Sequence, residues 1–83
     1  MKLLVATPRF TRDWNKLTAD AQKQISTVFD TLQRDPRSLD TKRLRGEQSP
    51  VLRIRIGDYR VLYSEKRDTI YLLRIGHRKD VYR

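Results

Sequence analysis

Residues 51–83 read VLRIRIGDYRVLYSEKRDTIYLLRIGHRKDVYR, and the pattern of this stretch decides the fold. Three apolar-rich runs, which we expect to be β-strands, occur at residues 51–56, 59–65 and 69–75. Gly57 and Asp58 fill the first gap and are typical of the tight turn that joins two antiparallel strands. A polar loop at 65–68 fills the second gap. The stretch therefore predicts an antiparallel meander of three strands.

Arginines alternate with apolar residues along the first of these strands. Leu52, Ile54 and Ile56 share one face, because successive side chains of a strand point to opposite sides of the sheet. Arg53 and Arg55 share the other face. This alternation is typical of a half-buried strand, so we expect the exposed side of the sheet to be cationic.

The first half of the chain predicts one strand and two helices. Residues 2–6 (KLLVA) are short, apolar and compatible with a strand. Thr7 can cap a helix whose first residue is a proline, where the missing N–H costs nothing. Thr18 can cap a second helix. That helix ends at Asp35 because the residue before a proline, here Pro36, is disfavoured in the α conformation.

Both predicted helices carry apolar residues at helical spacing, which indicates one core-facing stripe on each. The stripes contain Phe10, Trp14 and Leu17 in the first helix and Ala21, Ile25, Val28, Phe29 and Leu32 in the second. We expect Trp14 to anchor helix to sheet and not to stack on bases. The whole chain, residues 1–83, thus predicts a single small α+β domain of order βααβββ. Its antiparallel sheet has two N-terminal helices on one face and an open basic face.

Charge favours an anionic partner. The 83 residues include 19 Lys and Arg against 10 Asp and Glu, a net charge of +9, and most of the excess falls after residue 41. A concentrated basic half favours nucleic acid, with anionic lipid or an acidic protein as alternatives. The chain has no cysteine, which excludes disulfides and thiolate zinc sites. No run approaches membrane-spanning length and the N-terminal apolar stretch is short, so we expect a cytoplasmic protein without a membrane partner.

The connection at residues 37–50 is polar and carries a cluster of three cations, Lys42, Arg43 and Arg45. Two interpretations are equally open. The cluster is either a solvated loop or a rim of phosphate contacts.

A second group of polar residues gathers around the predicted meander. Arg60 lies just past the first turn, so it is expected close to Arg55. We expect Gly76 to end the third strand and to place His77 near the same rim, together with Arg78 and Tyr82. A guanidinium donates two parallel hydrogen bonds to a phosphate and stays charged at any working pH. Fixed cations of this kind stabilise charge that develops on a phosphoryl group during RNA cleavage. His77 is open to three interpretations: a base-stacking ring, a proton-transfer group or a structural residue.

Three segments, KRLRG, GDYRVLY and IGHRKDVYR, occur in this order around the meander. Together they resemble the RelE-type toxins of bacterial and archaeal toxin–antitoxin systems, within the RelE/ParE superfamily. The resemblance covers the whole chain. It implies a ribosome-dependent mRNA endoribonuclease that cleaves translated message in the A site by metal-independent 2′-OH attack, with no cofactor. It also implies a cognate acidic antitoxin, with the ribosome and mRNA as further partners.

The resemblance also assigns roles to residues. It implies that Arg60 holds the scissile phosphate, that Arg78 does the same or assists the leaving group, and that Tyr82 orients the nucleotide. Arg53 and Arg55 stand where well-known members carry lysines. Because arginine is a poor general base, these two are expected to bind phosphate, and the base is left open among Tyr82, His77 and the ribosome.

Two other functions fit the same sequence. One is a ParE-like toxin that binds and inhibits DNA gyrase without cutting RNA, because one fold supports different activities through different sites. The other is a non-catalytic RNA-binding module, which explains the charge but not the grouping of arginines with Tyr82.

Overall fold

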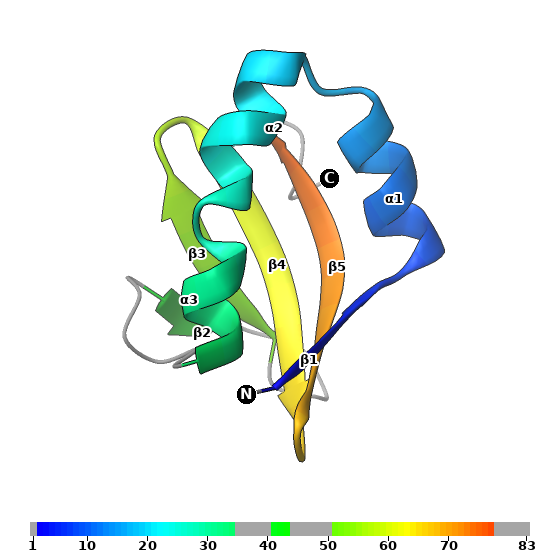
Figure 1. Cartoon of the computed structure of the whole chain (residues 1–83), viewed down its shortest axis with the longest axis vertical. Coiled ribbons are helices and arrows are strands. Elements are labelled where there is room, and N and C mark those ends of the chain that lie inside the picture. The colour runs from blue at the N-terminus through cyan, green and yellow to red at the C-terminus, as the bar shows by residue number, and fades with distance from the viewer. Residues whose placement is uncertain (1, 35–40, 44–50, 78–83) are drawn as a thin grey trace.

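The computed structural model describes residues 2–34, 41–43 and 51–77. Its helices cover one face of a five-stranded sheet (Figure 1). In chain order the elements are β1 (Leu3–Ala6), α1 (Pro8–Asn15), α2 (Ala19–Ser26), α3 (Phe29–Arg34), β2 (Thr41–Arg43), β3 (Leu52–Ile56), β4 (Tyr59–Lys66) and β5 (Thr69–His77). The predicted α+β class, with helices on one side of the sheet, is confirmed.

The sheet has the strand order β1-β5-β4-β3-β2. Strands β3, β4 and β5 form the predicted antiparallel meander, and β1 joins the far side of β5 in parallel. Strand β2 was not predicted, because residues 41–43 fall in the segment interpreted as a polar connection. This strand pairs antiparallel with the outer edge of β3. Backbone pairing with that edge forms the strand, since its three polar residues give no alternating apolar signal.

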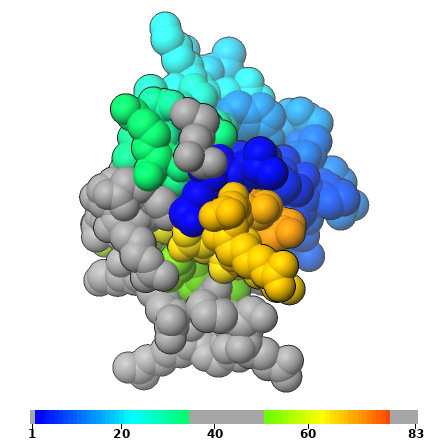
Figure 2. All heavy atoms as spheres, turned by 60° about the horizontal axis from the view of Figure 1, so that its bottom comes forward, coloured from blue at the N-terminus to red at the C-terminus, as the bar shows by residue number. Residues whose placement is uncertain are grey.

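The start of the described chain packs against the β4–β5 hairpin. Figure 2 shows the blue N-terminal residues packed directly against the yellow and orange hairpin. Lys2 makes an ion pair of 2.8 Å with Glu65, and its Nζ donates to the carbonyl of Arg67. These contacts hold β1 in the parallel register that brings Leu3 opposite Thr69.

The helix starts are confirmed and one helix is shorter than predicted. The Thr7 hydroxyl accepts a hydrogen bond from the backbone N–H of Phe10 at 3.3 Å. The Thr18 hydroxyl accepts one from the backbone N–H of Ala21 at 3.1 Å. The predicted second helix breaks after Ser26 and resumes at Phe29. The Ser26 and Thr27 hydroxyls each donate to a carbonyl three residues back, at 2.9 and 2.8 Å. Such bonds compete with the helical ladder, which accounts for the break.

The core lies between the helices and one face of the sheet. Its most deeply buried side chains are Ile25, Leu32, Ile54, Val61, Tyr63, Ile70 and Ile75. Trp14 packs against this core and stacks on Phe10 with ring centroids 6.2 Å apart, so the prediction that it is a core anchor is confirmed. A separate small apolar cluster, Val51 and Leu62 with Leu73, lies outside this main core.

Two glycines behave differently from one another. Gly57 has φ +59° at the first position of the β3–β4 turn, as a type II′ turn requires. Gly76 was expected to end the third strand, and this expectation is wrong. Strand β5 continues through Gly76 to His77, because the ladder with β4 extends to the Tyr59–His77 pair. This extension changes which face of the sheet His77 occupies.

Candidate functional site

The register of the sheet brings the predicted arginines onto one face. Arg55 lies directly opposite Arg60, and Arg53 lies opposite Leu62 on one side and Lys42 on the other. Directly opposed residues share a face, and this face is the one turned away from the core. We call the surface formed by Arg53, Arg55 and Arg60 the arginine face. Its existence was predicted from the alternation, and the register confirms it.

Arg60 is the most constrained member of this face. The residue is 7% exposed, whereas Arg55 is an exposed residue. Its Nη1 donates to the carbonyls of Gly57 and Tyr59 at 3.3 and 3.0 Å. Arg60 thus belongs to the predicted basic face, but its side chain is buried there because it folds back on the β3–β4 turn. The turn that gives Gly57 its positive φ thus also fixes this guanidinium.

The charge of Arg60 has no carboxylate partner within the described part of the chain; its hydrogen-bond acceptors there are the two neutral carbonyls. Burying a cation without a counter-charge is costly, and the cost falls when an anion binds. Arg55 stands directly across and adds a second positive charge, which disfavours the pair until an anion neutralises it. The arrangement therefore favours binding of an anionic group beside the turn.

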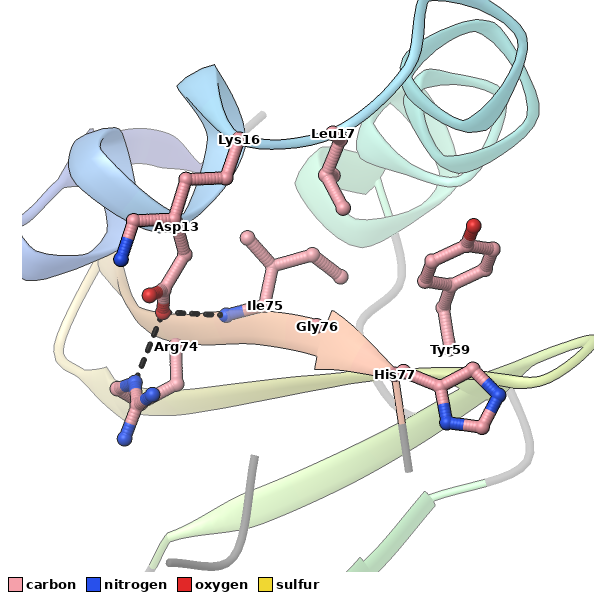
Figure 3. A pocket seen from close by; sticks show the side chains of 8 residues that line it. All are labelled: Asp13, Lys16, Leu17, Tyr59, Arg74, Ile75, Gly76 and His77. Atoms are coloured by element: carbon pink, nitrogen blue, oxygen red, sulfur yellow. Dashed lines mark hydrogen bonds and ion pairs between the residues drawn. The ribbon is translucent and has the colours of Figure 1, made fainter. Parts of the chain in front are cut away.

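His77 does not join the arginine face. It lies opposite Tyr59 on the helix side of the sheet, with the two rings edge to face and 6.2 Å apart. Figure 3 shows both rings at one end of a hollow that also contains Lys16 and Leu17. The prediction that His77 gathers with Arg60 is corrected, because the continuing strand turns this side chain to the opposite face.

An interaction that sequence reasoning missed lies at the other end of the same hollow. One carboxylate oxygen of Asp13, Oδ2, accepts from Arg74 Nε at 2.8 Å and from the backbone N–H of Ile75 at 3.2 Å (Figure 3). Strand β1 ends opposite Leu72, and no other strand of the described residues pairs with this edge of β5 beyond that point. Asp13 covers this edge with a charged side chain, which protects it from pairing with other chains. A signal was present: an acidic residue directly beside the apolar stripe of α1.

The remaining predicted site residues have limited structural description. Lys42 and Arg43 belong to β2, for which the backbone pairing is described. Arg45, Arg78 and Tyr82 lie outside the described residues. Among residues 2–34, 41–43 and 51–77, no group of three or more His, Asp or Glu side chains is placed to hold a metal ion. Within the same residues, no helix is both long enough and apolar enough to span a bilayer.

Comparisons with known proteins agree with the fold. The sequence model of the family described as ParE toxin of type II toxin–antitoxin system, parDE, matches residues 4–82. Toxin RelE3 of Methanocaldococcus jannaschii is 31% identical over 86 residues, which covers 99% of this chain and 96% of the relative.

Two solved structures are also similar. The toxin–antitoxin complex RelBE2 of Mycobacterium tuberculosis contains a chain with a TM-score of 0.81 and 30% identity, covering 93% of this chain and 98% of that one. The RelB–RelE antitoxin–toxin complex of Methanococcus jannaschii gives a TM-score of 0.76 at 27% identity, with 94% of each chain covered.

The family model, the relatives and the fold together define the class: this is a toxin of a type II toxin–antitoxin system. The chain belongs to the ParE toxin family by its sequence model, and its named relatives identify it as a RelE-type toxin within the RelE/ParE superfamily.

Proposed function

We propose that this toxin is a ribosome-dependent mRNA endoribonuclease that cleaves translated message by attack of the ribose 2′-OH on the adjacent phosphate. The observation that carries the proposal is the buried guanidinium of Arg60, fixed by two carbonyls and left without a carboxylate partner among the described residues. A cation held in this way is preorganised for charge that develops on phosphoryl oxygens. It therefore stabilises the transition state more than the ground state.

Arg55 and Arg53 bind the flanking phosphates in this proposal. Arg55 is exposed on the strand next to Arg60, so it can reach a strand of RNA that lies across the turn. Lys42 lies opposite Arg53 in the register of β2 with β3. We assign Arg43 and Arg45 to phosphate binding with Lys42 because the three cations cluster in the sequence. Cations in this position hold the substrate by its backbone and do not read its sequence.

The general base is Tyr82 or a group of the ribosome. Arginine stays protonated, so the pair on β3 cannot supply the base. His77 is disfavoured because it lies on the helix side of the sheet, beside Tyr59. We assign Arg78 and Tyr82 to the reaction on the resemblance to RelE-type toxins, Arg78 to the phosphate or leaving group and Tyr82 to nucleotide orientation and proton transfer.

The proposed partners are a cognate acidic antitoxin, the ribosome and its mRNA, in the cytoplasm. The solved relatives named above are RelB–RelE or RelBE2 complexes of toxin with antitoxin. A net charge of +9 favours an acidic, partly disordered partner that folds on the toxin.

A second candidate function is binding and inhibition of DNA gyrase, as the resemblance to ParE-like toxins implies. The observation in its favour is that the matching family model describes ParE toxins. Gyrase-dependent DNA breaks in cells with intact mRNA would support this candidate and contradict the first.

Primer extension on a reporter message tests the proposal. Controlled expression of the toxin is expected to produce cuts inside codons of a message that is being translated. The matched control is the same message without a ribosome-binding site, which should stay intact. Cuts that appear equally in both messages, or in neither, would contradict ribosome-dependent cleavage.

A further inference from the structure

The outer flank of α1 carries a second group of cations. Arg9, Arg12 and Lys16 are exposed on α1 and at its C-cap, and Arg74 approaches them from β5. Together with Asp13 they line a hollow of about 330 Å³. We call the four cations the flank patch. The distribution of charge along the sequence did not indicate the flank patch, because positive and negative charges are nearly equal in number in the first half of the chain.

The single acidic residue of the hollow is already engaged. Asp13 Oδ2 accepts hydrogen bonds from Arg74 Nε and from the backbone of Ile75. The side chains of Arg74 and Asp13 are 20% and 12% exposed, so this ion pair is held inside the hollow. Arg9, Arg12 and Lys16 make no ion pair with another described residue, so no carboxylate of the described part of the chain compensates these three charges at the rim.

The flank patch is long for a single small anion. Arg9, Arg12 and Lys16 follow at i, i+3 and i+7, so they share one side of the helix. At about 1.5 Å of rise per residue, their backbones span about 10 Å along the helix axis. A row of this length matches successive charges of a polyanion better than one phosphate ion.

The patch also continues the arginine face around the edge of the sheet. Arg74 lies opposite Leu62, two residues along β4 from Arg60, and therefore starts on the same face as Arg60. Its guanidinium reaches Asp13 across the edge that β1 leaves open beyond Leu72. One extended anionic partner can thus contact both surfaces.

The chemistry of the lining favours nucleic acid over a peptide. Every side chain that lines the hollow is charged, whereas a peptide helix docks by laying an apolar face into an apolar groove. The opposite side of α1 is apolar, with Phe10, Trp14 and Phe29 around a separate hollow. Phosphate contacts need arginine and lysine without apolar neighbours, and the flank patch supplies that combination.

We propose that the flank patch binds the sugar–phosphate backbone of folded RNA, and that this contact holds the toxin on the ribosome while the arginine face acts on the message. The inference rests on the proposed function for its biological setting. It makes Arg9, Arg12 and Lys16 binding residues that take no part in the chemical step.

The test compares two triple variants of equal charge. The first is Arg9→Gln, Arg12→Gln, Lys16→Gln; the control is Lys23→Gln, Arg34→Gln, Lys66→Gln, whose residues are exposed on other elements. Binding to purified prokaryotic ribosomes and to a naked RNA hairpin is measured over a range of salt concentrations, with thermal unfolding to check the fold. Arg74 is left intact because its ion pair belongs to the structure.

We expect the flank triple to bind ribosomes at least about tenfold more weakly than the control triple. Its salt dependence on the RNA hairpin should be shallower by about two to three units of log–log slope, since each lost phosphate contact removes about 0.7–0.9. Cleavage at saturating ribosome should be unchanged. Equal behaviour of the two triples on both probes overturns the inference, as does a variant that keeps its affinity for RNA and loses affinity for the antitoxin.

Binding to the naked RNA hairpin distinguishes a failure of the flank-patch inference from a failure of the proposed function. A wild-type protein that neither binds ribosomes nor cuts translated message contradicts the proposed function. If its hairpin binding is still weakened by the flank triple and not by the control, the flank patch stands as an RNA-binding surface.

Discussion

Arg60 is buried and Arg74 is partly buried, and the two arginines have opposite surroundings. Arg74 donates to the carboxylate of Asp13, so its charge is balanced within the fold. Arg60 is 7% exposed and donates to two neutral carbonyls. The first arrangement stabilises the sheet edge, whereas the second retains a charge that an external anion can satisfy. The partner of a buried arginine, and not its burial, therefore separates a structural cation from a candidate binding one.

The largest expected effect follows from replacing Arg60. Arg60→Met keeps the side-chain volume and removes the charge, and we expect cleavage of translated message to fall by about 10²–10³-fold. Stability should change by less than about 1 kcal/mol, because removing a buried unpaired charge offsets the lost hydrogen bonds and the freed carbonyls lie at a solvated turn. Quantitative primer extension and urea unfolding give the two numbers.

Arg60→Lys is the companion variant, since it keeps the charge and loses the fork of parallel donors. It should recover part of the activity of Arg60→Met. A protein in which Arg60→Met unfolds while Arg60→Lys does not would mean that Arg60, like Arg74, is a structural cation.

Replacing Asp13 should lower the stability of the fold and leave cleavage unchanged, the reverse of the outcome expected at Arg60. Asp13→Ala leaves Arg74 without its carboxylate and the N–H of Ile75 without an acceptor, and should cost about 2–3 kcal/mol of unfolding free energy. Cleavage per folded molecule should remain near the wild-type value. Thermal or urea unfolding measures the loss.

Arg74→Met is the control for that prediction. It removes the buried charge together with its need for a partner, so it should destabilise the protein less than Asp13→Ala does. If the two variants are equally destabilised, the carboxylate acts mainly through the backbone of Ile75 and not through the ion pair.

The surroundings of Arg60 and those of Arg74 were predictable from the sequence to different degrees. The closeness of Arg55 and Arg60 was predicted from a two-residue turn, which is a local property, whereas their direct pairing comes from the register of the structure. The ion pair of Asp13 with Arg74 joins residues 61 positions apart, and no local pattern fixes such a contact. His77 was placed wrongly because its face depends on whether the strand continues past Gly76, which the β4 ladder decides.

Within the fold, too, features that depend on neighbouring residues were predicted and features that depend on distant contacts were not. Caps, turns and apolar stripes predicted the meander and the helix starts, because each depends on neighbouring residues. The break after Ser26 depends on competing hydroxyl bonds, and β2 depends on a partner edge that its own sequence does not reveal.

A substitution at Gly57 tests how much the β3–β4 turn, which holds Arg60, contributes to the free energy of unfolding. Gly57→Ala should cost about 1–2 kcal/mol, since φ is +59° and an added Cβ would lie 2.9 Å from Gln24 Nε2. Gln24→Ala in the same protein relieves the contact and leaves the φ penalty. Urea unfolding of the single and double variants separates the two parts, and full recovery in the double variant would show that steric contact alone is responsible.

The smallest expected effect is at Arg55. The residue is exposed, so Arg55→Gln should weaken binding of the toxin to the RNA hairpin only a few-fold, by less than about 1 kcal/mol. The salt slope should fall by about 0.7–0.9, the value for one phosphate contact. Lys66 is an exposed cation at the end of β4, the strand that pairs with β3, so Lys66→Gln is the matched control.

Combining Arg55→Gln with Arg60→Met decides whether the arginine face acts as one site. The two residues are directly opposed, so a shared phosphate would make their effects on cleavage non-additive. Additive losses would mean that each guanidinium binds a different group. In that case Arg60 alone would mark the reacting phosphate, and Arg55 would belong to the binding surface around it.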